Sequence, residues 1–164
     1  MTLEKDINQH VFRSEYQKAA LNLIYTFNWV NEKFNRYFEP FDITQQQFNI
    51  LRILRGAGSP LSTLQIRQRM LDKMSDTSRI VDRLIRKGLV KKTVCREDRR
   101  LVDVLLTDKG KKLLQSMDVL NEELDTIFKN LNEQESRQLN VLLDKIRTTE
   151  TSPDIEPEPK PITG

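Results

Sequence analysis

The sequence has too few cysteine and histidine residues for the common structural crosslinks. Cys95 is its single cysteine and His10 its single histidine. A disulfide framework needs cysteine pairs, and a structural zinc site of the usual kind needs four cysteine or histidine ligands. Neither can form within one chain, so we expect no metal site and no cofactor.

Long apolar runs are also missing. No stretch approaches the roughly 18 consecutive apolar residues that a membrane-spanning helix requires. The first ten residues, MTLEKDINQH, carry acidic side chains and lack an apolar core, which argues against a signal peptide. We therefore expect a cytoplasmic protein without a membrane partner.

Glycine and proline are scarce outside the end of the chain. A chain of 164 residues can bury a real hydrophobic core, and 37% hydrophobic with 31% charged residues favours a soluble, mainly helical domain. The C-terminal segment TTETSPDIEPEPKPITG differs, because it combines recurrent proline with few apolar residues. We expect residues 148–164 to form a disordered tail.

Apolar residues recur every three or four positions through most of the chain, which is the period of an amphipathic helix. The pattern predicts a long helix over Val11–Phe38, followed by helices that begin near residues 44, 62, 75, 107 and 132. Thr44 with Gln47, and Ser62 with Gln65, have the spacing of the capping box at a helix start. The helix that begins near residue 107 is expected to reach residue 131.

The periodicity changes after Gly88. Leu89–Cys95 and Leu101–Thr107 are rich in β-branched and apolar residues and alternate in part, so we expect two strands joined by the charged segment 96–100. The sequence therefore predicts a mainly α protein with one small β-hairpin.

Positive charge is concentrated between Arg79 and Arg100. Polar side chains of the predicted helix near residue 80 lie largely off its apolar stripe, and Arg79 and Arg83 are one turn apart, so each can contact a guanine in the major groove. A solvated helix face gives the same pattern. The charged hairpin that follows favours DNA binding, with the helix in one groove and the hairpin beside it.

The hairpin tip can place an arginine in the adjacent minor groove. Asp98 can orient Arg100 through an ion pair, although an ordinary surface salt bridge has the same spacing. The expected contacts to double-stranded DNA are Ser75, Thr77, Ser78, Arg79, Arg83, Arg86, Arg96, Asp98, Arg99 and Arg100.

The run SDTSRIVDRLIRKGLVKKTVCREDRRLVDVLLTDKG resembles the multiple-antibiotic-resistance regulator (MarR) family of winged helix-turn-helix repressors. The shared features are the recognition helix, a Gly-Leu-Val start of the wing, an Asp-x-Arg wing tip and a Leu-Thr-x-x-Gly exit. DITQQQFNILRIL and PLSTLQIRQRM are similar to the second and third helices of the family, so the resemblance extends over Val11–Arg147. Arg67 departs from it, since a small alanine is common there, and base preference cannot be carried over.

The resemblance implies a homodimer that binds a pseudo-palindromic operator as a transcription repressor. Residues 1–147 would form the family domain, with the DNA-binding lobe at about 42–108 and dimerisation helices at 10–40 and 109–147. The long apolar seams at both ends support a dimer, because they exceed what one small winged domain can cover. The alternative is that these helices cover the core of their own chain.

The resemblance also implies a small aromatic effector that releases DNA. Aromatic side chains near the expected cleft are Trp29, Phe34, Tyr37, Phe38 and Phe41, although they can equally serve core or dimer packing. Cys95 lies close to Lys92 and Arg96, which suits a thiol sensor, but redox-sensing relatives keep that cysteine in the first helix, so a packed strand residue is favoured.

No serine, histidine or carboxylate array has a clear catalytic spacing, so an enzyme is not expected. The main rival is a protein-interaction module, in which the helical seams bind a different subunit and the basic hairpin is incidental. Salt dependence of duplex binding separates the two hypotheses.

Overall fold

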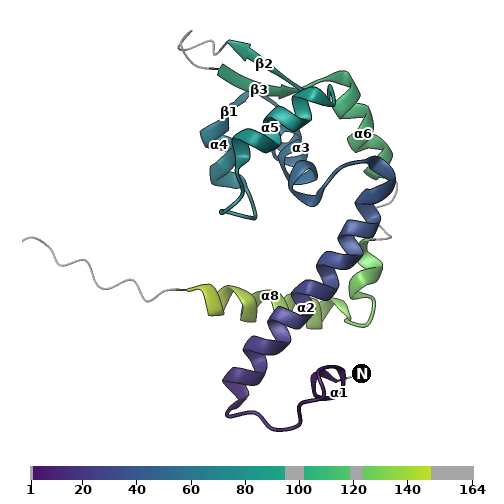
Figure 1. The fold of residues 1–164 in the computed structure, drawn as a ribbon, viewed down its shortest axis with the longest axis vertical. Coiled ribbons are helices and arrows are strands. Elements are labelled where there is room, and N and C mark those ends of the chain that lie inside the picture. Colours follow the sequence, from purple (N-terminus) through teal and green to yellow (C-terminus); the bar gives the residue numbers. More distant parts are fainter. Residues whose placement is uncertain (1, 95–101, 119–123, 149–164) are drawn as a thin grey trace, which may run out of the picture. The chain divides into compact units, whose positions relative to one another are not determined.

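The computed structural model describes residues 2–94, 102–118 and 124–148. The elements are α1 (Leu3–Asp6), α2 (Glu15–Phe38), η1 (Glu39–Phe41), α3 (Gln45–Ala57), β1 (Leu61–Ser62), α4 (Thr63–Arg69), α5 (Thr77–Arg86), β2 (Val90–Val94), β3 (Val102–Leu106), α6 (Asp108–Asp118), η2 (Thr126–Phe128) and α8 (Glu133–Arg147) (Figure 1). The chain divides into two compact units, residues 1–127 and 128–164. No helix in the described ranges is long and apolar enough to cross a membrane.

A three-stranded antiparallel sheet lies in the first unit, in the order β1-β3-β2. The hairpin register pairs Val90 with Leu106 and Val94 with Val102, while Leu61 of β1 pairs with Val104. Side chains alternate between the two faces of a strand, so Val104 and Leu106 share the buried face of β3. The predicted hairpin is confirmed, and the short strand β1 was not expected.

One hydrophobic core fills the first unit. Helices α3, α4 and α5 pack around it beside the sheet, and the C-terminal end of α2 and the buried face of α6 complete it. Its largest fully buried side chains are Ile50, Leu51, Ile66, Met70, Leu84, Leu114 and Met117. The core therefore fixes α5 from one side along its whole length and leaves the opposite side to solvent.

The helix starts are set by local capping. Thr44 and Ser62 each accept a hydrogen bond from the backbone N–H three residues later, and Gln47 and Gln65 bond back to the caps. Asn132 and Glu135 form the same reciprocal pair at the start of α8. Each box satisfies two N–H groups that a helix start would otherwise leave unpaired, so the starts predicted from sequence are confirmed.

Helix α2 is joined to the core only near its C-terminal end. Phe38 is buried, and Tyr37 meets its ring edge-on at a centroid distance of 5.1 Å. Pro40 lies in η1, and Asp42 then adopts a left-handed backbone with φ of 51°. The predicted end of this helix is confirmed, whereas its first residue is Glu15 rather than Val11.

The N-terminal helix α1 was not expected. It is tied to α2 by an ion pair of 2.5 Å between Glu4 Oε1 and Lys18 Nζ. The hydrogen bond from Lys18 lowers the pKa of Glu4 to about 2, so the pair persists through the neutral range. Leu3 is buried beside it.

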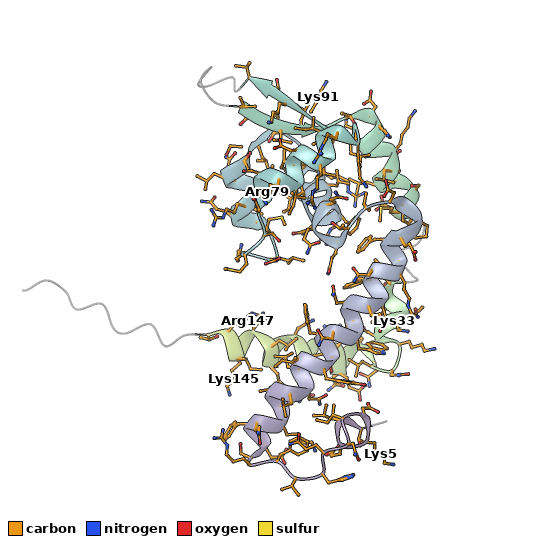
Figure 2. The ribbon with its side chains drawn as sticks, viewed as in Figure 1. Lys5, Lys33, Arg79, Lys91, Lys145 and Arg147 are labelled. Atoms are coloured by element: carbon orange, nitrogen blue, oxygen red, sulfur yellow. The ribbon has the colours of Figure 1, made fainter. Side chains whose placement is uncertain are left out.

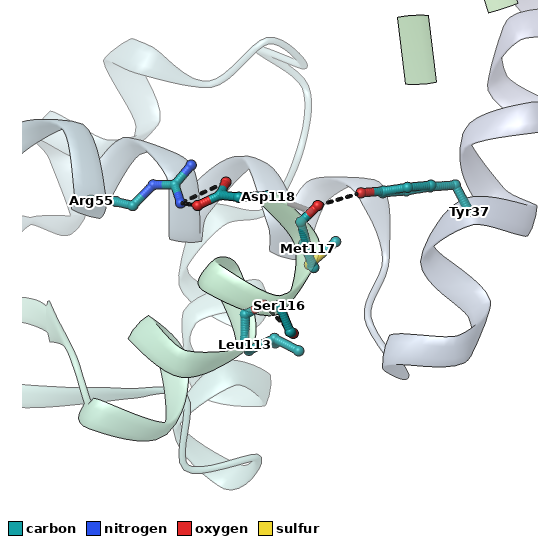
Figure 3. Close-up of polar contacts among 6 residues, drawn as sticks. All are labelled: Tyr37, Arg55, Leu113, Ser116, Met117 and Asp118. Carbon is teal, nitrogen blue, oxygen red and sulfur yellow. Dashed lines mark hydrogen bonds and ion pairs between the residues drawn. The ribbon is translucent and has the colours of Figure 1, made fainter. Parts of the chain in front are cut away.

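Polar contacts between elements far apart in sequence hold α6 in place (Figure 3). Arg55 Nη1 of α3 donates to both carboxylate oxygens of Asp118, at 2.9 and 2.7 Å. The Tyr37 hydroxyl donates to the carbonyl oxygen of Met117 at 3.0 Å. These two contacts position the C-terminal turn of α6 against both α3 and α2.

The expected single helix from residue 107 to 131 is wrong in its extent. Thr107 caps the start of α6, since its hydroxyl accepts a bond from the Gly110 N–H at 3.1 Å. The described part of α6 ends at Asp118, however, and Thr126–Phe128 is a 3-10 turn rather than α-helix. The expected disordered tail, residues 148–164, lies outside the described ranges except for Thr148, the C-cap of α8, and stays a prediction.

Candidate nucleic-acid interface

Helix α5 presents a polar face opposite its buried stripe. Val81 and Leu84 lie in the core, while Ser78, Arg79 and Arg83 are exposed. The Asp76 side chain caps the helix by accepting a hydrogen bond from the Arg79 N–H at 3.1 Å. Because α5 is ten residues long and anchored along one side, its outer face is a rigid platform for side chains.

The two predicted arginines on this face differ in their surroundings. Arg79 extends outward from the first turn with 81% of its side chain exposed, and its Nε lies 3.0 Å from the Asp76 carboxylate (Figure 2). Arg83 follows one turn later and, among the described residues, forms no ion pair. A guanidinium without an internal partner keeps all five donors for a ligand.

Thr77 does not belong to this face. Its side chain is only 4% exposed, and the hydroxyl is buried without a hydrogen-bond partner among the described residues. The prediction that Thr77 faces a partner is therefore wrong. Thr77 is the first residue of α5 and lies four and seven positions before Val81 and Leu84, on the same buried side of the helix.

The loop before α5 is held by hydrogen bonds to Asp72. The Ser75 hydroxyl donates to one oxygen of this carboxylate at 2.5 Å and the Met74 N–H to the other at 2.9 Å. These bonds lower the pKa of Asp72, with the Ser75 hydroxyl as the largest cause. Ser75 is thus engaged within the loop, and its oxygen remains available only as an acceptor.

Two surface pockets flank the start of α5 and reveal residues that the sequence did not single out. One, of about 320 Å³, joins Arg79 and Arg83 to Thr44 and Gln46 at the start of α3. The other, of about 480 Å³, joins Ser78 to Arg67 of α4. Gln46 and Arg67 are exposed polar residues on capped helices, but no local pattern connects them to α5, because packing alone brings them together.

Strand β2 carries further positive charge beside α5. Lys91 is exposed on β2 (Figure 2), as is Lys92. Lys92 Nζ lies 3.2 Å from the carboxylate of Asp82 on α5. This pair joins the hairpin to the helix. The hairpin tip falls outside the described residues, and with it Arg96, Asp98, Arg99, Arg100 and Cys95.

Arg86 lies apart from the other predicted contacts. It is exposed at the C-terminal end of α5 and lines a separate pocket with residues of η1 and α6. The structure therefore brings Ser75, Arg79 and Arg83 around one pocket and Ser78 beside the adjoining one. Arg86 shares the last turn of α5 with Arg83 but lines a different pocket.

The predicted aromatic effector residues do not share one pocket. Phe34, Tyr37 and Phe41 pack against the core around buried Phe38, while Lys33 Nζ lies 5.4 Å from the ring centroid of exposed Trp29. Tyr37 lines one pocket and Phe41 another. The geometry favours the packing alternative for Phe38.

The described residues contain no group of three or more histidine, cysteine, aspartate or glutamate side chains arranged to hold a metal ion. The polar face of α5, the adjoining pockets and the lysines of β2 thus define the site by hydrogen-bond donors and positive charge. Such a surface is suited to phosphate oxygens and to the edges of base pairs.

Comparison with known proteins gives concordant matches. The MarR family model matches residues 41–101. The multiple antibiotic resistance protein MarR of Salmonella typhimurium is 32% identical over 130 residues, which cover 76% of this chain and 88% of that protein.

Two solved structures extend the match to the fold. A mutant MarR from E. coli complexed with operator DNA aligns with a TM-score of 0.74 and 25% identity, over 85% of this chain and 100% of that chain. A MarR transcription factor from Planctomyces limnophilus aligns with a TM-score of 0.62 and 34% identity, over 82% and 99% of the two chains.

Proposed function

This chain belongs to the MarR family, and we propose that it is a transcription regulator that binds double-stranded operator DNA and represses the adjacent gene. The observation that carries the proposal is the polar face of α5, where Arg79 and Arg83 project one turn apart from a helix whose other side is fixed in the core. The operator-bound E. coli MarR structure supports it, since the two folds match over most of this chain.

In this proposal α5 enters the major groove. Arg79 and Arg83 read base edges, Ser78 at the helix start contacts a phosphate, and the lysines of β2 approach the neighbouring backbone. We further propose that Arg96, Arg99 and Arg100 reach the adjacent minor groove, with Asp98 orienting Arg100. Residues 42–108 would form the DNA-binding lobe, and the protein would act in the cytoplasm without a catalytic role.

We expect the affinity for a selected operator to fall steeply with salt. Neutralising six to ten phosphates releases enough counterions to weaken binding roughly 10³- to 10⁵-fold between 50 and 200 mM salt. Fragments selected from the source genome supply the duplex, and fluorescence anisotropy measures its binding. Arg100→Ala should weaken binding at low salt, whereas Arg147→Ala, which removes an exposed partner of Asp144 on α8, serves as the control.

Binding that ignored both salt and Arg100→Ala would count against DNA recognition by the hairpin. It would instead favour the protein-interaction alternative, in which the helical seams hold a different subunit.

We propose that a second copy of the chain covers apolar side chains that α2 leaves exposed. Large hydrophobic side chains lie in solvent on this helix: Tyr16, Leu23, Ile24, Tyr25, Phe27 and Trp29. Helix α8 likewise exposes Leu139, Val141, Leu142 and Ile146. So many exposed large apolar side chains on two helices favour an association site, and two-fold pairing would also present two α5 helices to a pseudo-palindromic operator.

Sedimentation should show a dimer that one charge on α2 disrupts. Phe27→Glu places a carboxylate on a position that is 62% exposed in one chain, and burying it against a partner without a counter-charge is costly. We expect this variant to sediment as a monomer at micromolar concentration. Gln68→Glu adds the same charge at an exposed position of α4, away from α2 and α8, and should stay dimeric. A wild-type monomer that remains folded would contradict the proposal.

A small aromatic effector that releases DNA remains part of the proposed function. Phe34, Tyr37 and Phe41 are the predicted residues that stay partly accessible at the core boundary.

A further inference from the structure

Helix α4, the loop before α5 and the first turn of α5 together form a pocket of about 480 Å³, here called the α4–α5 pocket. The two helices pack against each other (Figure 1), and the buried side chain of Ile66 fixes α4 in the core. Leu64 and Arg67 lie three positions apart on one side of α4, and both line the pocket. The pocket therefore extends the polar face of α5 onto α4.

Two large apolar side chains of this pocket lie in solvent. Met74, in the loop before α5, is 94% exposed, and Leu64 is 63% exposed. Single exposed apolar residues are common on protein surfaces, whereas these two line one pocket beside a helix face with free hydrogen-bond donors. A partner that covered the pocket would be stabilised by the burial of this apolar surface.

Arg67 gives the pocket a free positive charge. Its side chain is exposed, and within the described residues it forms no ion pair and no hydrogen bond. The Asp76 carboxylate also lines the pocket, but it already accepts a hydrogen bond from the Arg79 N–H and lies 3.0 Å from Arg79 Nε. Ser78 adds a hydroxyl group at the start of α5. The pocket therefore offers a guanidinium and a hydroxyl to an anion, next to an apolar surface.

We propose that the α4–α5 pocket binds the operator beyond the bases that the arginines of α5 read, an inference that rests on the proposed function. Arg67 and Ser78 bind one backbone phosphate, and Leu64 and Met74 cover the C5-methyl group of a nearby thymine. Duplex DNA is the occupant that suits the pocket, because it supplies both groups and because the pocket is continuous with the face of α5. Arg67 is also where this chain departs from the family resemblance, so the resemblance does not imply this contact.

The phosphate contact is tested by the salt dependence of binding. Arg67→Ala should weaken binding to the selected operator and to a random duplex alike, because a phosphate contact carries no sequence information. The slope of log affinity against log salt should become shallower by about one unit. Arg67→Lys keeps the charge and should keep most of the slope. Fluorescence anisotropy at a series of salt concentrations measures all three proteins.

Arg69→Ala is the matched control for the loss of an arginine from α4. Arg69 is exposed two positions after Arg67, on a different side of the helix, and does not line the pocket. Its removal should leave the salt slope unchanged.

The apolar contact is tested with operators in which deoxyuridine replaces one thymine at a time. Loss of the contacted methyl group should weaken wild-type binding about fourfold, the effect of exposing one buried methyl group. In a variant that combines Leu64→Ala with Met74→Ala, the same replacement should have no further effect. Leu71→Ala removes a side chain that is 76% exposed and lies outside the pocket, so this control should keep the full methyl effect.

A salt slope that Arg67→Ala leaves unchanged would overturn the proposal. So would a methyl effect that is absent, or that is equally large with and without the Leu64 and Met74 side chains. Unchanged operator affinity in every pocket variant would leave the pocket to a protein partner. In each of these cases the wild type still binds the operator, and the proposed function stands. A wild-type chain that bound no duplex would instead remove both proposals.

Discussion

Arg83→Ala is expected to weaken operator binding about 10- to 100-fold. A bidentate contact between arginine and guanine contributes about 1–3 kcal/mol of discrimination, and each 1.4 kcal/mol corresponds to a tenfold change in affinity. Arg83 has no competing ion pair within the described residues, so its guanidinium is fully available. Anisotropy titrations with the selected operator, at one fixed salt concentration, measure the loss.

The variant should lose specificity as well as affinity. If Arg83 reads a base, the ratio of operator to random-duplex affinity falls, whereas the loss of a phosphate contact weakens both duplexes alike. Arg36→Ala is a suitable control, because Arg36 is an exposed arginine of α2 that pairs with Glu32. Unchanged operator affinity in Arg83→Ala would exclude this face of α5 from recognition.

Arg79 is expected to behave differently, and the difference follows from its surroundings. The Asp76 carboxylate lies 3.0 Å from its Nε and partly occupies its donors. Asp76→Asn frees the guanidinium and lessens the negative charge close to the DNA, while an amide oxygen still caps the helix. The cap and the orientation of Arg79 are therefore separable functions of one side chain.

Features encoded by neighbouring residues were predictable from sequence. The capping pairs at Thr44, Ser62 and Asn132 each involve a residue three positions later, so the pattern alone contains both partners. The two strands were predicted from the alternation within each, and the predicted bounds differ from the observed ones by one residue at the start of β2 and at the end of β3. The other two predicted ends, Cys95 and Leu101, lie outside the described residues.

Features that depend on distant segments were not predictable in the same way. The sequence predicts an exposed Thr77 because the residue is polar and lies at a helix start. Its side chain is buried because of tertiary packing, which its neighbours in sequence do not determine. The bond between Arg55 and Asp118 spans 63 positions, and Gln46 approaches Arg79 only because α3 packs on α5. Polar residues such as Gln46 join the site only because the fold brings them next to α5. Sequence periodicity does not identify them.

The Leu-Thr-x-x-Gly motif, formed here by Leu106, Thr107 and Gly110, has a structural explanation. The Thr107 hydroxyl donates to the carbonyl oxygen of Gly88 at 2.7 Å, and the Thr107 N–H donates to that of Leu89 at 3.1 Å. These bonds bring the first turn of α6 onto the backbone at the start of β2. Gly110 lies at the closest approach, where a Cβ atom would stand 2.2 Å from the Leu89 carbonyl oxygen.

Gly110→Ala is therefore expected to destabilise the protein by about 3 kcal/mol, the upper part of the usual range for overpacking. The clash is with the Gly88–Leu89 backbone, which the two hydrogen bonds from Thr107 hold in place, so no flexible side chain can move aside to relieve it. Thermal unfolding followed by circular dichroism should show a melting temperature lower by on the order of 10 °C.

Gly56→Ala is the matched control, since a Cβ at Gly56 in α3 would meet nothing within 4 Å. Alanine has a higher helix propensity than glycine, so this variant should gain up to about 1 kcal/mol. If Gly110→Ala lowers the stability and Gly56→Ala raises it, then position 110 requires glycine because of the close Leu89 carbonyl oxygen and not because of glycine flexibility. A Gly110→Ala variant as stable as the wild type would mean that α6 can move away from β2 at little cost, and the rigid positioning of the hairpin beside α5 would lose its basis.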